Sequence, residues 1–475
     1  MIKAFDELWS EGRDAFNQSR TFEKARSIAY GAITCMGRRT LTGMLTACGK
    51  QFMDWSASYR IFEKDRVDTE KLFDVALQHG LQCSPSDEIV VAHLDDTLLK
   101  KTGKKVVGTA WRRDPLGPPF HTNFIWAQRF VQISLAIPQG NDCCQSRSIP
   151  VDFIHCPSAK KPKPKASPEE LKDFREQQRI LKMSHQGVLR IQHLRKKLDD
   201  LGEQNKELLM SVDGGYTNAT VLKFLPERVT LIGRVRKDAK FYKPAQEQNQ
   251  VGRKKTYGDR VPTPEQIRQS PSVPWQQVKG WAAGKAHIFN VKIVQNLLWR
   301  PAGKQHNLTL IIIKPLGYRL TKNSQTIYRQ PAYLIHTKSN LSLEKLLQAY
   351  LWRWEIEVNF REEKTLIGCG QSQVRTEKAI KTLPAFVIAM YAFINLAAHK
   401  VCNKRTQQLL PRPKWYPAKN EQRITGSEMI NLFRCQYWLE KPQLNFSGFV
   451  QNEHHNQSLK KMSNPFAAAV FYARK

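Results

Sequence analysis

The sequence has far fewer acidic than basic residues. It also has no CxxC cysteine pair and no run of about 18 apolar residues. Without such an apolar run we expect no membrane span. The first residues, MIKAFDELWSEGRDAF, mix charges and lack the apolar centre of a signal peptide, so we expect a cytoplasmic protein. The nine cysteines are scattered, which indicates neither a zinc ribbon nor a disulfide framework and favours reduced thiols.

The shortage of acids gives the chain a strong positive charge. It holds 75 Lys and Arg against 42 Asp and Glu, a formal net charge of +33 over 475 residues. Charge of this size selects partners and not a fold. We therefore expect a polyanionic partner. Nucleic acid is favoured over an anionic membrane surface, because the sequence shows no strongly basic amphipathic helix of the interfacial kind.

The order of helical and strand-like patterns predicts an α/β fold with five parts. They are an N-terminal helical DNA-binding domain (1–86), a first part of a catalytic core (87–235), an inserted β-rich subdomain (236–344), a second part of the core (345–402) and a C-terminal region for dimerisation or DNA contact (403–475). The N-terminal helices fit a plain helical cap equally well. Three strand-like segments at the start of the core predict an antiparallel meander: 89–97, 104–113 and 124–138.

Three long helices are expected beside these strands. The segment SPEE marks a helix start, with Ser167 as N-cap and Pro168 at the first helical position, and this helix should continue to about residue 198. The pattern of 341–364 predicts a second helix. A third, at 383–401, is apolar enough for a core but short and flanked by polar residues, which does not favour a membrane span.

Two apolar strands of the predicted core end in aspartates. Asp95 and Asp96 follow IVVAHL, and Asp213 follows ELLMSV. A carboxylate at a strand end leaves the core where the sheet holds the backbone in place, although a single aspartate there is more often a turn or cap residue. These positions therefore predict a site only if a further acid joins them.

The segment YLWRWEIEVNFREEK supplies four glutamates, one of which shares a helical face with phosphate-binding side chains. At about 100° per residue, four side chains fall within roughly 60° of arc: Tyr350, Arg353, Glu357 and Lys364. The remaining glutamates fall on other faces and are expected to be solvated or bridging: Glu355, Glu362 and Glu363. Glu357 is therefore the acid to which we assign a separate task.

An acid among phosphate-binding groups indicates a metal site. Arg353 lies one turn before Glu357, and a neighbouring cation keeps a carboxylate in the ionised form that divalent metals bind. Hydroxyl, guanidinium and ammonium groups suit phosphate oxygens. Two aspartates and one glutamate would make a hard-oxygen cage for two Mg²⁺ ions that clamp a phosphoryl transfer. From the residues alone, an ordinary salt-bridged helix explains the same pattern equally well.

The sequence resembles a known family at these positions. Tyr350, Arg353, Glu357 and Lys364 match the signature Y-x2-R-x3-E-x6-K of bacterial insertion-sequence transposases of the DDE class. HLDDT and SVDGGYTN are similar to the two Asp regions of that family, and LIGRVRKDAKFY and GRKKTYGDR to its inserted segment. The resemblance runs in order from about residue 40 to 400. It implies an RNase H-like core, a mixed sheet flanked by helices.

The resemblance implies a cut-and-paste DNA transposase. Such an enzyme cuts the ends of an insertion sequence and joins them to target DNA by two-metal-ion phosphoryl transfer. It implies the following catalytic acids and ligands of two Mg²⁺ ions, which Mn²⁺ can replace: Asp95, Asp213 and Glu357. It implies three DNA phosphate contacts: Tyr350, Arg353 and Lys364. The implied partners are terminal inverted repeats and target DNA as duplexes, with a second copy of the chain in the DNA complex, on the bacterial nucleoid.

Several alternatives stay open. Relatives show Asp, one variable residue, then Thr or Ser, which favours Asp95 over Asp96 as the first acid, and Asp96 should then point to the opposite side of its strand. An inactive or repurposed transposase would bind DNA without cutting it. A glycoside hydrolase with paired carboxylates fits the charge poorly. Some relatives stack a flipped base on a Trp of the inserted segment, but none of Trp275, Trp281 and Trp299 is assigned that role.

Overall fold

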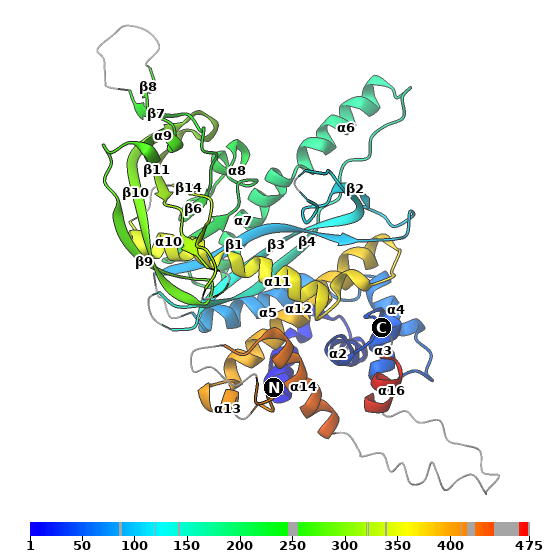
Figure 1. Ribbon diagram of the computed structural model, residues 1–475. Coiled ribbons are helices and arrows are strands. Elements are labelled where there is room, and N and C mark those ends of the chain that lie inside the picture. Colours follow the sequence, from blue (N-terminus) through cyan, green and yellow to red (C-terminus); the bar gives the residue numbers. More distant parts are fainter. Residues whose placement is uncertain are drawn as a thin grey trace, which may run out of the picture.

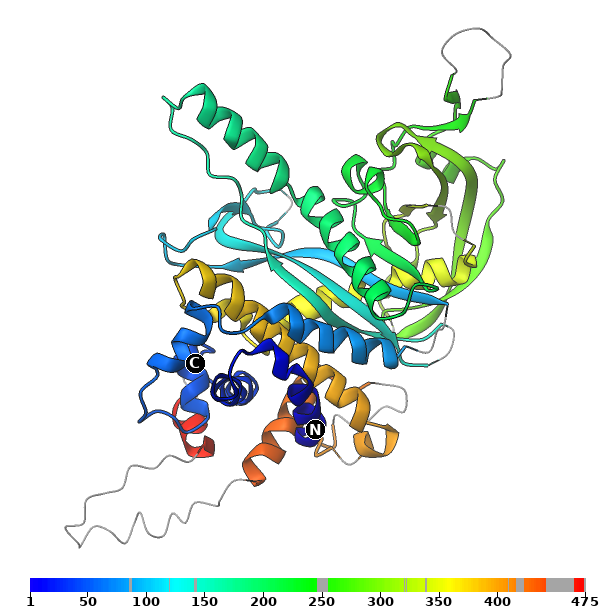
Figure 2. The ribbon, with the colours of Figure 1, turned by 180° about the vertical axis from the view of Figure 1, so that it is seen from behind.

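Helices cover both faces of one large sheet. Figure 1 shows α10 (Leu343–Trp352) and α11 (Trp354–Thr365) in front of the sheet, and Figure 2, from the opposite side, shows α7 (Met183–Asp200) in front of it. The mixed α/β arrangement expected for an RNase H-like fold is thus confirmed. The computed structural model describes residues 1–84, 88–118, 120–140, 143–245, 255–319, 321, 323–337, 340–408, 410–415, 423–440 and 465–473.

The sheet continues from the expected core into the expected inserted segment. The core strands are β1 (Ile89–Lys100), β2 (Ala110–Arg113), β3 (Phe124–Pro138), β4 (Ser146–His155), β5 (Glu207–Val212) and β6 (Val229–Arg234). The later strands are β7 (Phe241–Pro244), β8 (Tyr257–Arg260), β9 (Gln276–Ala282), β10 (Lys285–Trp299), β11 (Gly303–Ile313) and β14 (Ala332–His336). Their order is β2-β3-β1-β5-β6-β14-β11-β10-β7-β8, with β4 on β3 and β9 on β10. A separate short ladder joins β12 (Gly317–Tyr318) and β13 (Ile327–Tyr328).

The first strands do not form the meander that the sequence predicts. They are antiparallel as expected, but β3 lies between β1 and β2. The reason is the length of β3. One of its edges pairs with β1, and its other edge pairs with β2 at its start and with β4 along the rest. β4 has no counterpart among the strands that we predicted.

The N-terminal helices share a hydrophobic core with the centre of the molecule. They are α1 (Ile2–Glu11), α2 (Ser19–Thr34), α3 (Leu41–Ala47), α4 (Ser56–Glu63) and α5 (Thr69–Gln82). Their apolar side chains form one cluster with α12 (Glu377–Val401). By length and composition α12 would suffice to cross a membrane, but 94% of its most apolar window is buried inside the protein, as expected of a core helix.

The C-terminal region is described only in part. Its helices within the described residues are α13 (Lys404–Gln408), α14 (Gly426–Leu439) and α16 (Pro465–Phe471). α14 joins the cluster around α12 through Met429, Ile430 and Phe433. Most of 441–475, and the first part of GRKKTYGDR, lie outside the described residues. Whether this region pairs two subunits stays a prediction.

The helix predicted from Ser167 exists but is interrupted. Ser167 caps α6 (Pro168–Ile180) with a capping box, in which its hydroxyl accepts from the Glu170 amide and the Glu170 carboxylate accepts from the Ser167 amide. The chain then turns at Leu181 and Lys182 before α7 begins. α6 buries none of its residues and extends away from the body in Figures 1 and 2, whereas α7 packs on the sheet. Two short helices complete the list: α8 (Ala219–Lys223) and α9 (Pro264–Gln269).

The second predicted helix is also interrupted, at Arg353. This residue ends α10 and precedes α11 while keeping right-handed helical angles, φ −51° and ψ −30°. The Arg353 amide donates to the Tyr350 carbonyl, and the Ile356 amide donates to the Arg353 carbonyl. These bonds span three residues instead of four, so the backbone is locally tighter than an α-helix. The junction lies inside the segment that carries the signature residues.

One glutamate of α11 is buried instead of solvated. Glu363 is 1% exposed, and its Oε1 accepts from Gln132 Nε2 at 2.9 Å. Within the described part of the chain its Oε2 has no hydrogen-bond partner. Burial raises the pKa of Glu363 to about 8, and the hydrogen bond from Gln132 opposes that shift. The Glu363 side chain of the folded protein therefore remains protonated at pH values well above those at which a glutamate ordinarily loses its proton.

Glu363→Gln should make stability less dependent on pH. The unfolded chain releases the Glu363 proton near its ordinary pKa, whereas the folded protein keeps it to about 8, so wild type loses stability as pH rises toward 8. The variant has no proton to lose. Its melting temperature relative to wild type should therefore rise by a few degrees between pH 5 and pH 8. Glu344→Gln, at an exposed position of α10, is the control. An equal difference at both pH values would contradict the buried-acid interpretation.

Candidate active site

The two predicted aspartate regions lie side by side at one point of the sheet. β1 and β5 are parallel, and their pairing ends at Leu94 opposite Val212. Asp95 is the next residue of β1, and Asp213 directly follows the last residue of β5, so both lie just beyond the last pair. β1 itself does not end there as expected. It continues to Lys100, because the long β3 remains available as its partner.

Asp95 and Asp96 face opposite sides of the sheet, as strand alternation requires. Asp95 lies on the side of α10 and α11, where its Oδ2 is 3.3 Å from Arg353 Nη1. Asp96 faces the α7 side, where its Oδ2 is 3.3 Å from Arg129 Nε and its Oδ1 accepts from the Tyr216 hydroxyl at 3.1 Å. The expected opposition of the two side chains is confirmed.

Arg353 joins two of the three predicted acids. Its Nη1 contacts Asp95, and its Nη2 lies 2.8 Å from Glu357 Oε1. The Arg353 and Asp95 side chains are 13% and 16% exposed, so solvent screens this pair less than a surface ion pair. The guanidinium therefore connects a strand of the sheet to α11 through charge.

Asp213, at the end of the neighbouring parallel strand β5, is the third of the predicted acids. Its Oδ1 accepts from the Gly215 amide at 2.9 Å and from the Tyr216 amide at 3.3 Å, which fixes its orientation. Burial and, next, the neighbouring Asp213 raise the pKa of Asp95 to about 7, and Arg353 opposes both. Asp95 and Asp213 thus lie close enough to repel one another. A cation shared between them would relieve that repulsion.

The other two predicted DNA contacts lie at different distances from these acids. Tyr350 adjoins Arg353: burial raises the pKa of its hydroxyl, the nearby Arg353 and Arg234 lower it, and Asp213 raises it. Lys364 lies two turns along α11 from Glu357, about 10 Å by helical rise. Its ammonium is 5.8 Å from the centre of the Phe360 ring. The structure therefore groups Tyr350 with the acids and separates Lys364 from them.

The donor set suits a divalent metal, although its present arrangement is centred on Arg353. Three carboxylates supply the hard oxygens that Mg²⁺ prefers. Among the described residues, however, no group of three or more His, Cys, Asp or Glu is placed to hold a metal ion. In this structure the guanidinium of Arg353 contacts both Asp95 and Glu357.

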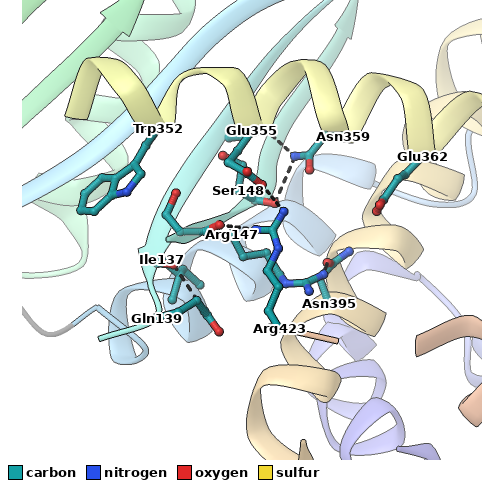
Figure 3. Close-up of polar contacts among 12 residues, drawn as sticks. Ile137, Gln139, Arg147, Ser148, Trp352, Glu355, Asn359, Glu362, Asn395 and Arg423 are labelled. Atoms are coloured by element: carbon teal, nitrogen blue, oxygen red, sulfur yellow. Dashed lines mark hydrogen bonds and ion pairs between the residues drawn. The ribbon is translucent and has the colours of Figure 1, made fainter. Parts of the chain in front are cut away.

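The remaining polar residues of α11 anchor the helix to the protein. Glu355 pairs with Arg423, as Figure 3 shows, and the Asn359 amide donates to the Ser148 carbonyl at 3.1 Å. Glu362 accepts from the Tyr391 hydroxyl at 2.6 Å. The expected bridging role is thus confirmed for Glu355. Asn359 is a further anchor that the helical pattern did not single out.

A large basic cavity begins directly after Asp213. It has a volume of about 1250 Å³, and Gly214, Thr217 and Trp299 are among its lining residues. Six cations line it: Arg234, Arg236, Lys237, Lys240, Arg268 and Arg300. Two of them pair with acids, Arg236 with Asp238 and Arg268 with Glu265. The sequence signal for this cavity was the basic segment LIGRVRKDAKFY. Of the three tryptophans considered above, Trp299 belongs to its lining.

The mixed sheet with helices on both faces is consistent with an RNase H-like protein of the DDE type. Residues 13–305 match the DDE superfamily endonuclease family. Because the match covers more than half of the chain, the protein belongs to this family, whose members act on DNA as nucleases or transposases. The match includes Asp95 and Asp213 and ends before Glu357. No curated protein matches the sequence.

The Glu355–Arg423 pair should contribute measurably to the stability of α11. Both side chains are about four-fifths buried, so removing one partner leaves the other charge poorly solvated. Arg423→Gln should lower the free energy of unfolding by about 1–3 kcal/mol. In a double-mutant cycle with Glu355→Gln, measured by urea unfolding, the double variant should lose less than the sum of the two single losses. Strict additivity would show that the pair is not coupled.

Proposed function

We propose that the protein is a DNA transposase that cuts the ends of an insertion sequence and joins them to target DNA. Membership in the DDE superfamily endonuclease family supports this proposal. The net charge of +33 and the large basic cavity support a DNA substrate. The observation that carries the proposal is the contact of Arg353 with both Asp95 and Glu357, beside Asp213.

In this proposal Asp95, Asp213 and Glu357 are the catalytic acids and hold two Mg²⁺ ions, with Mn²⁺ as a substitute. Bound ions would activate the attacking water or 3′-hydroxyl and stabilise the leaving oxygen. The Gly215 amide keeps Asp213 oriented toward the site. The guanidinium of Arg353 serves as counterion of the acids until it turns to a DNA phosphate, whose oxygens match its donors.

The proposed DNA contacts follow from the same geometry. Tyr350 and Arg353 would bind a phosphate next to the cleaved bond, because both lie beside the acids. Lys364 would bind a phosphate further along, because it lies about 10 Å from Glu357 along α11. Asp95 is preferred as the first acid because it faces Arg353 and Glu357, whereas Asp96 faces Arg129.

The organisation of the chain is proposed to serve these steps. The N-terminal helices (1–86) would bind the terminal inverted repeats, and the core parts (87–235 and 345–402) would carry out the chemistry. The inserted segment (236–344) would hold DNA in the large basic cavity, to which it contributes most of the lining. A second copy of the chain would join the DNA complex, partly through 403–475. The site of action would be the bacterial cytoplasm, on the nucleoid.

A second candidate function is DNA binding without cleavage. One observation favours it: within the described residues no three ligands are placed to hold a metal, and Arg353 neutralises two of the acids. A protein of this kind would grip DNA through its positive charge alone. Its affinity would fall steeply with salt, as would that of the transposase. Only a cleavage assay separates the two functions.

Glu357→Gln should abolish Mg²⁺-dependent cleavage of element ends while leaving DNA binding intact. The amide keeps the size of the side chain but cannot supply a metal ligand of full charge, so the cleavage rate should fall by at least about a hundredfold. Gel shifts in EDTA measure binding, and denaturing gels in Mg²⁺ or Mn²⁺ measure cleavage. Glu344→Gln serves as the control. Cleavage at the wild-type rate by Glu357→Gln would exclude it as a catalytic acid, and DNA binding by wild type with no scission would favour the second function.

Asp95→Asn and Asp96→Asn should separate the two neighbouring aspartates. Asp95→Asn should eliminate cleavage in the same assay, because it removes a proposed metal ligand. Asp96→Asn should retain cleavage within about tenfold, because Asp96 faces Arg129 and Tyr216 and not Arg353. The opposite pattern of activities would assign the first catalytic position to Asp96.

A further inference from the structure

A second basic cavity lies on the α7 side of the sheet, opposite Arg353. We call it the small basic cavity. It has a volume of about 610 Å³ and is formed by β2, β3, the loop after β4, the start of α7 and the turn after Asp213. Its lining includes Arg112, Arg129, Lys182, Ser158 and Ser184. The described residues that line it include no Asp or Glu. Its charge is therefore positive and is offset in part by Asp96, which contacts Arg129.

Two buried polar groups of this cavity lack partners. The side chains of Arg112 and Ser184 belong to residues that are 7% and 6% exposed, and both line the cavity. Within the described residues, Arg112 Nε and Ser184 Oγ have no hydrogen-bond partner. Arg112 Nη2 donates to Ser158 Oγ at 3.1 Å, which holds the guanidinium in place. Buried donors without acceptors are unfavourable, so a ligand that brings acceptor oxygens would be stabilised here.

The start of α7 adds further donors. α7 has 18 residues, and its N-cap, Lys182, makes no side-chain capping bond. The first amides of an uncapped helix point outward and carry partial positive charge. Ser184 lies in this first turn, next to the ammonium-bearing Lys182. Residues that carry guanidinium, ammonium, hydroxyl and amide donors thus line one cavity, and phosphate oxygens match this donor set.

The position of the cavity relates it to the proposed active site. Gly215 lines the small basic cavity, whereas Gly214 and Thr217 line the large one. The turn that carries Asp213 therefore lies between two basic cavities. A strand whose scissile phosphate rests at Asp213 would have one cavity on each side of the cut.

We propose that the small basic cavity binds a phosphodiester group of the DNA strand beside the cleavage point, on the side away from the large basic cavity. The proposal rests on the proposed function, because it requires DNA at Asp213. A phosphate of DNA is favoured over a free anion because the cavity adjoins that turn and because the whole chain is strongly basic. Arg112 and Lys182 are the cations that would contact it.

The test is the affinity of the full-length chain for a 30-bp DNA duplex, measured by fluorescence anisotropy without divalent metal over a series of salt concentrations. Arg112→Gln and Lys182→Gln each remove one charge from the cavity. Arg175→Gln on α6 and Lys196→Gln on α7 remove the same charges at exposed positions. Loss of one phosphate contact lowers the slope of log affinity against log salt by about 0.9. We expect this decrease and an affinity loss of about tenfold for the two cavity variants only.

The outcomes are distinguishable. If wild type binds DNA and the cavity variants behave as their controls, the cavity inference is wrong and the proposed function is untouched. If wild type binds no DNA, the proposed function fails and the inference fails with it. A parallel melting experiment with inorganic phosphate identifies a third case: protection by phosphate that only the cavity variants lose, with unchanged DNA affinity, would overturn the assignment to DNA. Lys182, being exposed, keeps the test decisive if Arg112→Gln fails to fold.

Discussion

The contact of one guanidinium with two carboxylates organises the centre of this protein. Arg353 stands at the junction of α10 and α11 and touches Asp95 on β1 and Glu357 on α11. Without a cation there, Asp95, whose pKa is already raised by burial and by the neighbouring Asp213, would lie near other carboxylates with no counterion. The arginine therefore supplies a counterion at the place where these acids gather. We propose that metal and DNA take over its two roles, as counterion and as partner.

The other polar side chains of α11 hold this helix in one orientation against the protein. Glu355, Asn359 and Glu362 each contact a different part of the protein, and Glu363 is buried against β3. The helix thus cannot rotate without breaking several polar contacts at once. Arg353, at the start of this helix, contacts Asp95 and also Glu357. The two basic cavities then lie on either side of the Asp213 turn, so the acids and the proposed strand contacts share one rigid frame.

Local patterns predicted individual side-chain contacts and directions better than they predicted the order of the strands. The spacing of Arg353 and Glu357 is a property of one helix, so sequence periodicity could find their pairing even though the helix is interrupted at Arg353. Strand alternation likewise predicted the opposite directions of Asp95 and Asp96. The place of β3 between β1 and β2 depends on which distant edge a long strand pairs with, and no local pattern reports that. The sequence pattern did not predict the burial of Glu363 for the same reason, because its partner Gln132 is far away in the chain.

The central claim is that Asp95, Asp213 and Glu357 form one metal centre that Arg353 occupies in the absence of metal. A crystal structure of the protein with an element-end DNA duplex and Mn²⁺, with the metal located by anomalous scattering, tests it most directly. The account predicts manganese bound to Asp95, Asp213 and Glu357, with Arg353 released from these acids and in contact with a DNA phosphate. Bound DNA with Arg353 still joining Asp95 to Glu357, and no manganese at these carboxylates, would contradict it.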